Sequence, residues 1–117
     1  MAKLIFLPQF IDERGELTVV ENLFPQNYKS VYFIKNADGF VKGNEHEKKA
    51  HQALICINGS VDITVKQKEL VESYTLNSSN QCLLLKPEEW NSLDNFRNNA
   101  ILLVASNENY DAGDYVW

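Results

Sequence analysis

The chain has 117 residues, of which 44% are hydrophobic and 23% are charged, a composition typical of a globular protein and not of a disordered chain. The formal net charge is -5 and no basic stripe is present, so a nucleic-acid partner is not expected. No apolar run approaches the roughly 20 residues of a membrane-spanning helix, so no membrane partner is expected either.

The first half of the chain contains short strand-like segments separated by turn residues. Residues 3–7 and 16–20 are predicted strands, and the turn at 12–15 between them contains Gly15, which tolerates positive φ. Residues 30–35 are rich in Val, Tyr, Phe and Ile and are predicted to form a third strand. After a turn at 38–39, residues 40–47 begin as a strand and become strongly polar.

The middle of the chain carries a strong hairpin signal. Residues 51–57 are apolar on both faces, whereas 61–66 alternate between apolar and polar. Asn58-Gly59 lies between them, and this pair suits the positive φ angles of a type I′ turn. The pattern predicts two antiparallel strands joined by that turn.

Residues 70–76, 81–85 and 100–105 supply three more predicted strands, and no stretch shows a long amphipathic helical period. Short strands separated by regular turns indicate an all-β sandwich or barrel. About nine or ten antiparallel strands favour a small jelly roll, the double-stranded β-helix of the cupins.

The length predicts a single domain over 1–117. The N-terminal apolar run is broken at Pro8, too soon for a secretory signal. Cys56 and Cys82 both lie inside apolar runs, which predicts reduced core thiols in a cytoplasmic protein; a disulfide is the alternative.

The polar segment around residue 46 keeps the spacing of a cupin ligand motif. Gln52 is followed by six residues and Gly59, and Glu45 and Glu47 stand where that motif has histidines. Residues two apart in a strand share a face, so both carboxylates would face one cavity, with His46 opposite. Their repulsion would raise at least one pKa and create a base poised near neutral pH. The alternative is a solvated charge run in a loop.

The same residues speak against a bound metal or cofactor. Glu45, Glu47 and Gln52 offer oxygen ligands, but no histidine follows Pro87. Sites for iron, manganese or zinc usually contain imidazole or thiolate ligands, so we expect no metal. No nucleophile triad and no glycine-rich phosphate loop is recognisable.

Over nearly its whole length the chain resembles the sugar 3,4-ketoisomerases, WxcM-like cupins that act on dTDP-linked 4-keto-6-deoxy sugars. The segments that carry the resemblance are 12–17, Glu21 with Phe24-Pro25, 31–34, 42–48, 52–60, 76–77, 87–90, 102–106 and 110–116. The Gly59-Ser60 pair and the closing Tyr-Asp-x-x-Asp-Tyr pattern are specific in combination.

The resemblance implies an isomerase that moves a ketone from C4 to C3 of the hexose without a metal or other cofactor. A base removes the acidic proton at C3, an enediol forms, and a proton returns at C4. The resemblance also implies a homodimer that exchanges N-terminal strands, a dTDP-linked keto sugar as the bound partner, and a role in supplying deoxyamino sugars for surface polysaccharides.

The chain departs from the family at the expected acid–base groups. The family pattern Arg-Gly-x-His-Ala-His-Lys becomes Lys42 to Lys48 here, with Glu45 and Glu47 replacing both histidines. A glutamate can serve as the base beside a ketone, as it does in triosephosphate isomerase. Glu47 is therefore the first candidate for the base and Glu45 the second. The alternatives are a dTDP-sugar-binding cupin that no longer catalyses, and altered chemistry such as epimerisation.

The remaining candidate residues each have a functional and a structural interpretation. The resemblance assigns Arg14 to the diphosphate and Tyr32 to proton transfer; an exposed turn charge and a core tyrosine are the alternatives. Other predicted substrate contacts are Lys42, His46, His51, Gln52 and Trp90. Structural roles stay open for these residues, above all for His51, which lies on a buried strand.

Overall fold

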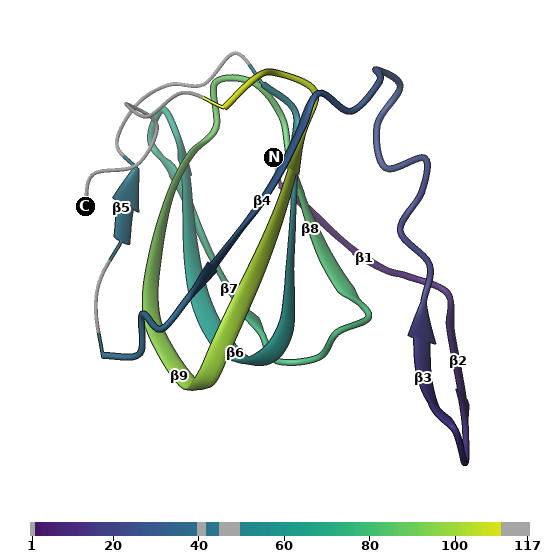
Figure 1. Cartoon of the computed structure of the whole chain (residues 1–117). Coiled ribbons are helices and arrows are strands. Elements are labelled where there is room, and N and C mark those ends of the chain that lie inside the picture. Colours follow the sequence, from purple (N-terminus) through teal and green to yellow (C-terminus); the bar gives the residue numbers. More distant parts are fainter. Residues whose placement is uncertain (1, 40–41, 45–49, 111–117) are drawn as a thin grey trace.

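The computed structural model describes residues 2–39, 42–44 and 50–110, and these residues form nine strands and no helix (Figure 1). The strands are β1 (Lys3–Phe6), β2 (Gln9–Asp12), β3 (Gly15–Thr18), β4 (Ser30–Lys35), β5 (Lys42–Asn44), β6 (Gln52–Gln67), β7 (Leu70–Leu76), β8 (Gln81–Leu85) and β9 (Trp90–Ser106). Among the described residues, no helix is long and apolar enough to cross a membrane.

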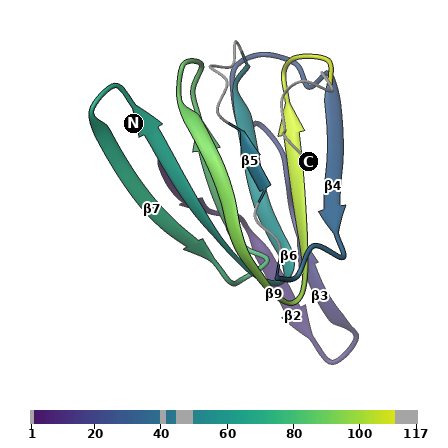
Figure 2. The same cartoon turned by 90° about the vertical axis from the view of Figure 1, so that its left-hand side faces the viewer.

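Two long strands shape the molecule, because β6 and β9 pair with each other along both of their halves. The first half of β6 and the second half of β9 belong to one wall, with the order β1-β8-β6-β9-β4. The other halves form the second wall, where β7 pairs with β6 and β5 pairs with β9. Both long strands turn back on themselves, and the two walls converge at that bend (Figures 1 and 2). All of these pairings are antiparallel, and the jelly-roll prediction is confirmed.

The predicted hairpin at Asn58-Gly59 is wrong, because β6 continues through these residues. Gly59 has a φ of +70°, but Asn58 is not among the residues with positive φ, so a type I′ turn is excluded. The register between β6 and β9 shifts repeatedly between Cys56 and Asp62, as it does at β-bulges. The Asn58 amide donates to the carbonyl oxygens of Asn98 (3.4 Å) and Asn99 (2.9 Å) on the facing strand. The pair therefore lies at the bend of one continuous strand that passes from the first wall into the second, and is not a two-residue hairpin turn between separate strands.

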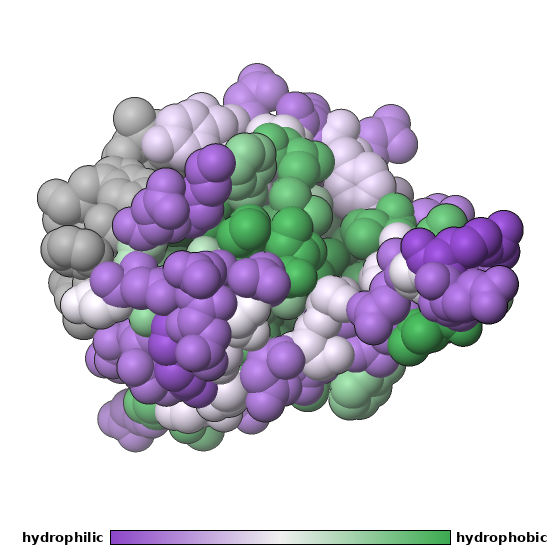
Figure 3. Space-filling model, turned by 60° about the horizontal axis from the view of Figure 1, so that its bottom comes forward, coloured by the Kyte–Doolittle hydropathy of each residue, from purple (hydrophilic) through white to green (hydrophobic). Residues whose placement is uncertain are grey.

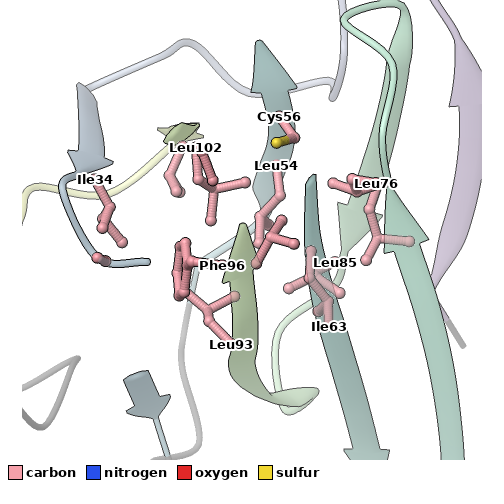
Figure 4. Close-up of a cluster of buried hydrophobic side chains, with 14 of the residues drawn as sticks. Ile34, Leu54, Cys56, Ile63, Leu76, Leu85, Leu93, Phe96 and Leu102 are labelled. Atoms are coloured by element: carbon pink, nitrogen blue, oxygen red, sulfur yellow. The ribbon is translucent and has the colours of Figure 1, made fainter. Parts of the chain in front are cut away.

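The space between the walls is filled by apolar side chains from both walls (Figure 4). Leu54 and Cys56 enter it from the first half of β6, and Ile63 and Val65 from the second half. Phe96 is 2% exposed and is the largest fully buried side chain among the described residues. Alternate residues of each strand therefore point into this core, and a residue's position in the alternation shows which way it faces.

A second apolar cluster covers the outer face of the first wall. Leu7 and Leu23 from the N-terminal segment pack there with Ala53, Ile55 and Cys82. Cys56 and Cys82 are both buried and free, as predicted. Burial raises the pKa of the Cys82 thiol to about 12, because it penalises the charged thiolate.

Strands β2 and β3 form a separate two-stranded sheet that projects from the barrel (Figure 1). We call residues 9–18 the arm. Phe10, Ile11 and Leu17 on the arm are each more than half exposed. Figure 3 shows apolar side chains gathering between the arm and the barrel.

Candidate functional site

The first residues of both long strands lie at the end of the barrel opposite the bend. Gln52 begins β6 and Trp90 begins β9, and the bend lies in the middle of each strand. We call this end the open end. Polar side chains that face inward here are the candidates for binding a ligand between the walls.

Gln52 and Tyr32 meet at the open end, on the first wall. Gln52 shares its face with Leu54 and is 2% exposed, so its amide faces the interior. Its Nε2 donates to the Tyr32 hydroxyl at 3.5 Å. Tyr32 lies two residues before buried Ile34 on β4, so it shares that face, and it packs against the core. The predicted site residues Gln52 and Tyr32 are therefore brought together.

Tyr110 extends this cluster from the C-terminal end of the described chain. Its ring centroid lies 5.4 Å from that of Tyr32 in an edge-to-face arrangement, and it is 51% exposed. This cluster contains the amide of Gln52, the hydroxyl of Tyr32 and the aromatic ring of Tyr110. Such a combination can hydrogen-bond and stack a small polar ligand.

His51 faces the other side of the same wall. Its backbone N–H donates to Asn107 Oδ1 at 2.8 Å, and the Asn107 N–H donates to the His51 carbonyl at 3.3 Å. Its ring lies 6.3 Å from that of Phe24, which packs on the outer cluster. Consecutive residues of a strand point in opposite directions, so His51 and Gln52 do not share a site within this chain. This placement supports the structural interpretation of His51.

Trp90 lies at the rim of the second wall and is 40% exposed. It pairs across the sheet with exposed Lys66. The two line an open pocket of about 530 Å³ together with Gln67, Lys68 and Glu88. The pocket presents an indole, two ammonium groups and the Glu88 carboxylate, so it offers a stacking surface with a mixed set of charges.

Arg14 lies in the turn between β2 and β3, at the tip of the arm that projects from the barrel (Figure 1). Its side chain is 85% exposed and donates to Asp12 Oδ2 from Nε (3.1 Å) and from a terminal nitrogen (2.6 Å). The side-chain hydrogen bonds from Arg14 lower the pKa of the Asp12 carboxyl. The structure does not bring Arg14 to the open end of its own barrel.

The two expected bases lie outside the described residues, as does His46. Lys42 is in β5, where its backbone pairs with Leu93, and Asn44 of the same strand pairs with Asn91. The segment that carries Glu45 and Glu47 therefore directly follows a strand of the second wall. Within the described ranges, no three His, Cys, Asp or Glu side chains are grouped to hold a metal ion.

Two residues at the open end are not predicted from the sequence. Tyr110 belongs to the C-terminal motif but has no predicted role, and Asn91 follows the Pro87 corner, where only the lack of a histidine draws attention. The alternation of β9 could have found Asn91, because buried Leu93 lies two residues away on the same face. That signal is hidden, since the Asn and Asp residues between 91 and 99 disfavour a strand.

Known proteins of one kind match this chain over almost its full length. The family described as FdtA: WxcM-like, C-terminal matches residues 1–117. A TDP-4-oxo-6-deoxy-alpha-D-glucose-3,4-oxoisomerase from Aneurinibacillus thermoaerophilus is 30% identical to this chain, in an alignment that covers 97% of this chain and 84% of that protein.

Solved structures agree with this match. QdtA, a sugar 3,4-ketoisomerase from Thermoanaerobacterium thermosaccharolyticum in complex with TDP, superposes with a TM-score of 0.88 at 35% identity, covering 98% of this chain and 86% of the other. The WlaRB TDP-quinovose 3,4-ketoisomerase from Campylobacter jejuni gives a TM-score of 0.89 at 33% identity, with 98% and 91% covered.

Proposed function

Because the chain belongs to the FdtA family (WxcM-like, C-terminal), we propose that it is a nucleotide-sugar 3,4-ketoisomerase acting on a dTDP-linked 4-keto-6-deoxyhexose. The observation that carries the proposal is the agreement over nearly the whole chain with 3,4-ketoisomerases in both sequence and structure. The inward-facing polar cluster of Gln52 and Tyr32 supports a ligand site at the open end.

The proposed reaction moves protons at both carbons and at both oxygens, with no net oxidation. The C4 ketone acidifies the proton on C3, and a base removes it while the C4 oxygen gains a proton, which gives a C3–C4 enediol. The C3 hydroxyl then loses its proton as the C3 ketone forms, and C4 takes up a proton. Every proton and electron pair stays within substrate, protein and water, so no oxidant is required.

We assign the base to Glu47, with Glu45 as the second candidate. Strand β5 ends at Asn44, beside the inward-facing end of β9, which supports a position for the following residues near the open end. Tyr32 is the proposed partner in proton transfer, since its hydroxyl lies at that end. An apolar interior would raise the pKa of a carboxyl there and suit it to accept a proton near neutral pH.

The proposed substrate contacts divide between sugar and nucleotide. Gln52 suits the hexose, since an amide can donate and accept at sugar oxygens. Lys42 and His46 are proposed to face the diphosphate. Trp90 lies on the outer face of the second wall, opposite in direction to Asn91, so its proposed contact is with the nucleotide outside the barrel and not with the hexose. His51 packs beside Phe24 at the outer cluster, so its proposed role is to hold the backbone next to Gln52 in place and not to contact the sugar.

We also propose a homodimer that exchanges its N-terminal strands, in the cytoplasm. The arm pairs with neither wall of its own barrel, and its apolar side chains are exposed. Val31 and Phe33 on β4 are 60% and 59% exposed, and a soluble chain gains stability by covering such residues. Arg14 at the tip of the arm would then reach the diphosphate in the partner's barrel.

Deuterium uptake tests the isomerase proposal. The wild-type protein and a dTDP-4-keto-6-deoxyhexose are incubated in D2O, and label on the ring carbons is measured by NMR together with the 3-keto product. We expect label and product from wild type and neither from Glu47→Gln.

The other outcomes are also informative. Uptake that survives in both Glu45→Gln and Glu47→Gln overturns the assigned base. Substrate binding without any uptake by the wild type overturns catalysis, and supports the dTDP-sugar-binding cupin that the loss of both family histidines suggested.

A further inference from the structure

The described residues contain very few buried polar side-chain atoms without a hydrogen-bond partner. These are Ser60 Oγ, Glu89 Oε2, Asn91 Nδ2 and Asn91 Oδ1. Three of the four belong to residues 89 and 91, at the start of β9, where that strand enters the open end. Buried polar groups are nearly always paired, so this concentration calls for a physical reason.

Asn91 is the extreme case, because both ends of its amide are unpaired. It is 2% exposed, and neither its nitrogen nor its oxygen has a hydrogen-bond partner among the described residues. An amide buried in this way makes the folded chain less stable than one whose amide is paired. Glu89 differs, because its other oxygen accepts the Lys86 N–H at 2.7 Å and so closes the turn before β9.

Two independent observations show that Asn91 faces between the walls. Along β9 it alternates with Trp90 and shares its face with Leu93, which lies in the core. Across the sheet it pairs with Val65 of β6, also a core residue, and opposite residues of an antiparallel pair point to the same side. Asn91 therefore faces inward from the second wall, while Gln52 and Tyr32 face inward from the first wall.

We propose that Asn91 is a sugar-contacting residue, whose amide donates to one hexose oxygen and accepts from a neighbouring hydroxyl. The inference rests on the proposed function and names a residue for it on the second wall. A 4-keto-6-deoxyhexose presents a carbonyl next to a hydroxyl, which matches the donor and acceptor of one primary amide. Binding the sugar would supply the partners that the described part of the chain does not give this amide. On this proposal, the unpaired Asn91 amide lowers the stability of the free protein but forms hydrogen bonds with the sugar in the complex.

The test compares Asn91→Leu, which keeps the branched shape and removes the polar atoms, with Ser60→Ala. Ser60 is the matched control, because its hydroxyl is also buried and unpaired but lies at the bend, away from the open end. Three quantities are measured on the full chain: the midpoint of urea unfolding, the affinity for TDP alone, and kcat/KM for the dTDP-4-keto sugar. We expect both variants to unfold at a midpoint equal to or above that of wild type, and TDP affinity to change less than about twofold.

For Asn91→Leu alone, kcat/KM is expected to fall by about 10- to 100-fold, the effect of leaving a buried polar group of the sugar without its hydrogen-bond partner. Unchanged kcat/KM in Asn91→Leu overturns the inference while the isomerase proposal stands. An equal loss of affinity for TDP also overturns it, because the contact would not be to the sugar. Should Asn91→Leu fold poorly, Asn91→Ser is substituted, and the same comparison of TDP with the keto sugar decides. A wild-type protein that neither binds nor isomerises the keto sugar refutes the proposed function itself.

Discussion

Gly59 packs closely against the backbone of Arg97, where the paired strands β6 and β9 bend together. A β-carbon on Gly59 would come within 2.5 Å of the Arg97 carbonyl oxygen, and would also meet the Asn98 carbonyl oxygen and the Ala100 α-carbon. These neighbours are backbone atoms, which move only if the bend itself changes. Closing the barrel between its two walls therefore depends on the absence of a side chain at residue 59.

Gly59→Ala should destabilise the protein by about 2–4 kcal/mol, because an alanine at positive φ is strained and the added carbon overpacks the bend. Urea unfolding at pH 7 measures the loss. Gly39→Ala is the matched control, since its φ is +80° but nothing lies within 4 Å of the added carbon. It should lose only about 1 kcal/mol, the cost of the backbone strain. Equal losses in the two variants would show that the close approach at the bend is unimportant.

Tyr32→Phe is expected to lower kcat by about 100-fold or more, the range for loss of a group that assists proton transfer. The phenylalanine ring can keep the edge-to-face contact with Tyr110, so the folded structure should persist. Steady-state isomerisation measures the effect. Tyr28→Phe is the control, because its hydroxyl accepts the Leu23 N–H at 3.2 Å and its ring packs on Phe24 of the outer cluster, not between the walls. A Tyr32→Phe enzyme with wild-type kcat would assign Tyr32 to packing alone.

Leu17→Glu should convert the proposed dimer into a monomer, because it places a charge on the apolar arm that a partner would bury. Leu17 is 59% exposed in the single chain, and light scattering after size exclusion at micromolar concentration measures the mass. Leu70→Glu changes a residue that is equally exposed (62%) but lies on β7, and it should leave the dimer intact. A wild-type protein that is monomeric in this measurement would contradict the exchange of arms.

Asp62 should stabilise the fold only above acidic pH. Its pKa is lowered below the ordinary value of 3.8, first by the hydrogen bond from Asn95 and then by those from Thr75 and Arg97. A lowered folded-state pKa gives stability that is fully present above about pH 4 and is lost as the pH falls through the folded-state value. The side chain is 37% exposed, so solvent screening keeps the contribution below about 1 kcal/mol.

The comparison that tests this is Asp62→Asn against wild type in urea unfolding at pH 7 and pH 3. The variant should be less stable at pH 7, and the difference should shrink at pH 3. Glu69→Gln, an exposed change in the β6–β7 turn, should show no such dependence. A difference that grows on acidification would reverse the predicted sign.

Cys82 should resist alkylation in the native protein. With a pKa of about 12, only about one thiol in ten thousand is ionised at pH 8, and the thiolate is the reactive form. Burial also raises the pKa of Cys56. Iodoacetamide labelling followed by peptide mass spectrometry should therefore modify both residues only when urea unfolds the chain. Rapid labelling of Cys82 without denaturant would show that the outer cluster opens readily.

The class of fold and the family could be recognised from the amino-acid sequence, because both depend on local patterns. Alternation and turn residues located β4, β7 and β8 close to their observed bounds. Spacing and resemblance also pointed to Gln52 and Tyr32 as candidates, and their side chains meet in the structure. Sequence patterns failed where a local preference was overruled: Asn58-Gly59 favours a turn in isolation, and residues 90–99 are too rich in Asn and Asp to suggest a strand.

The course of these strands and the directions of their side chains depend on contacts between residues that are distant in the chain. Pairing with β9 along the whole length of β6 outweighs the turn preference of two residues, so the chain bends there and continues. Positive φ at Asn95, Asn98 and Asn99 lets β9 follow the same bend. The direction in which each side chain points follows from that pairing, which separates His51 from Gln52 and turns Asn91 inward. No local sequence pattern contains this information, because it arises only when the two long strands meet.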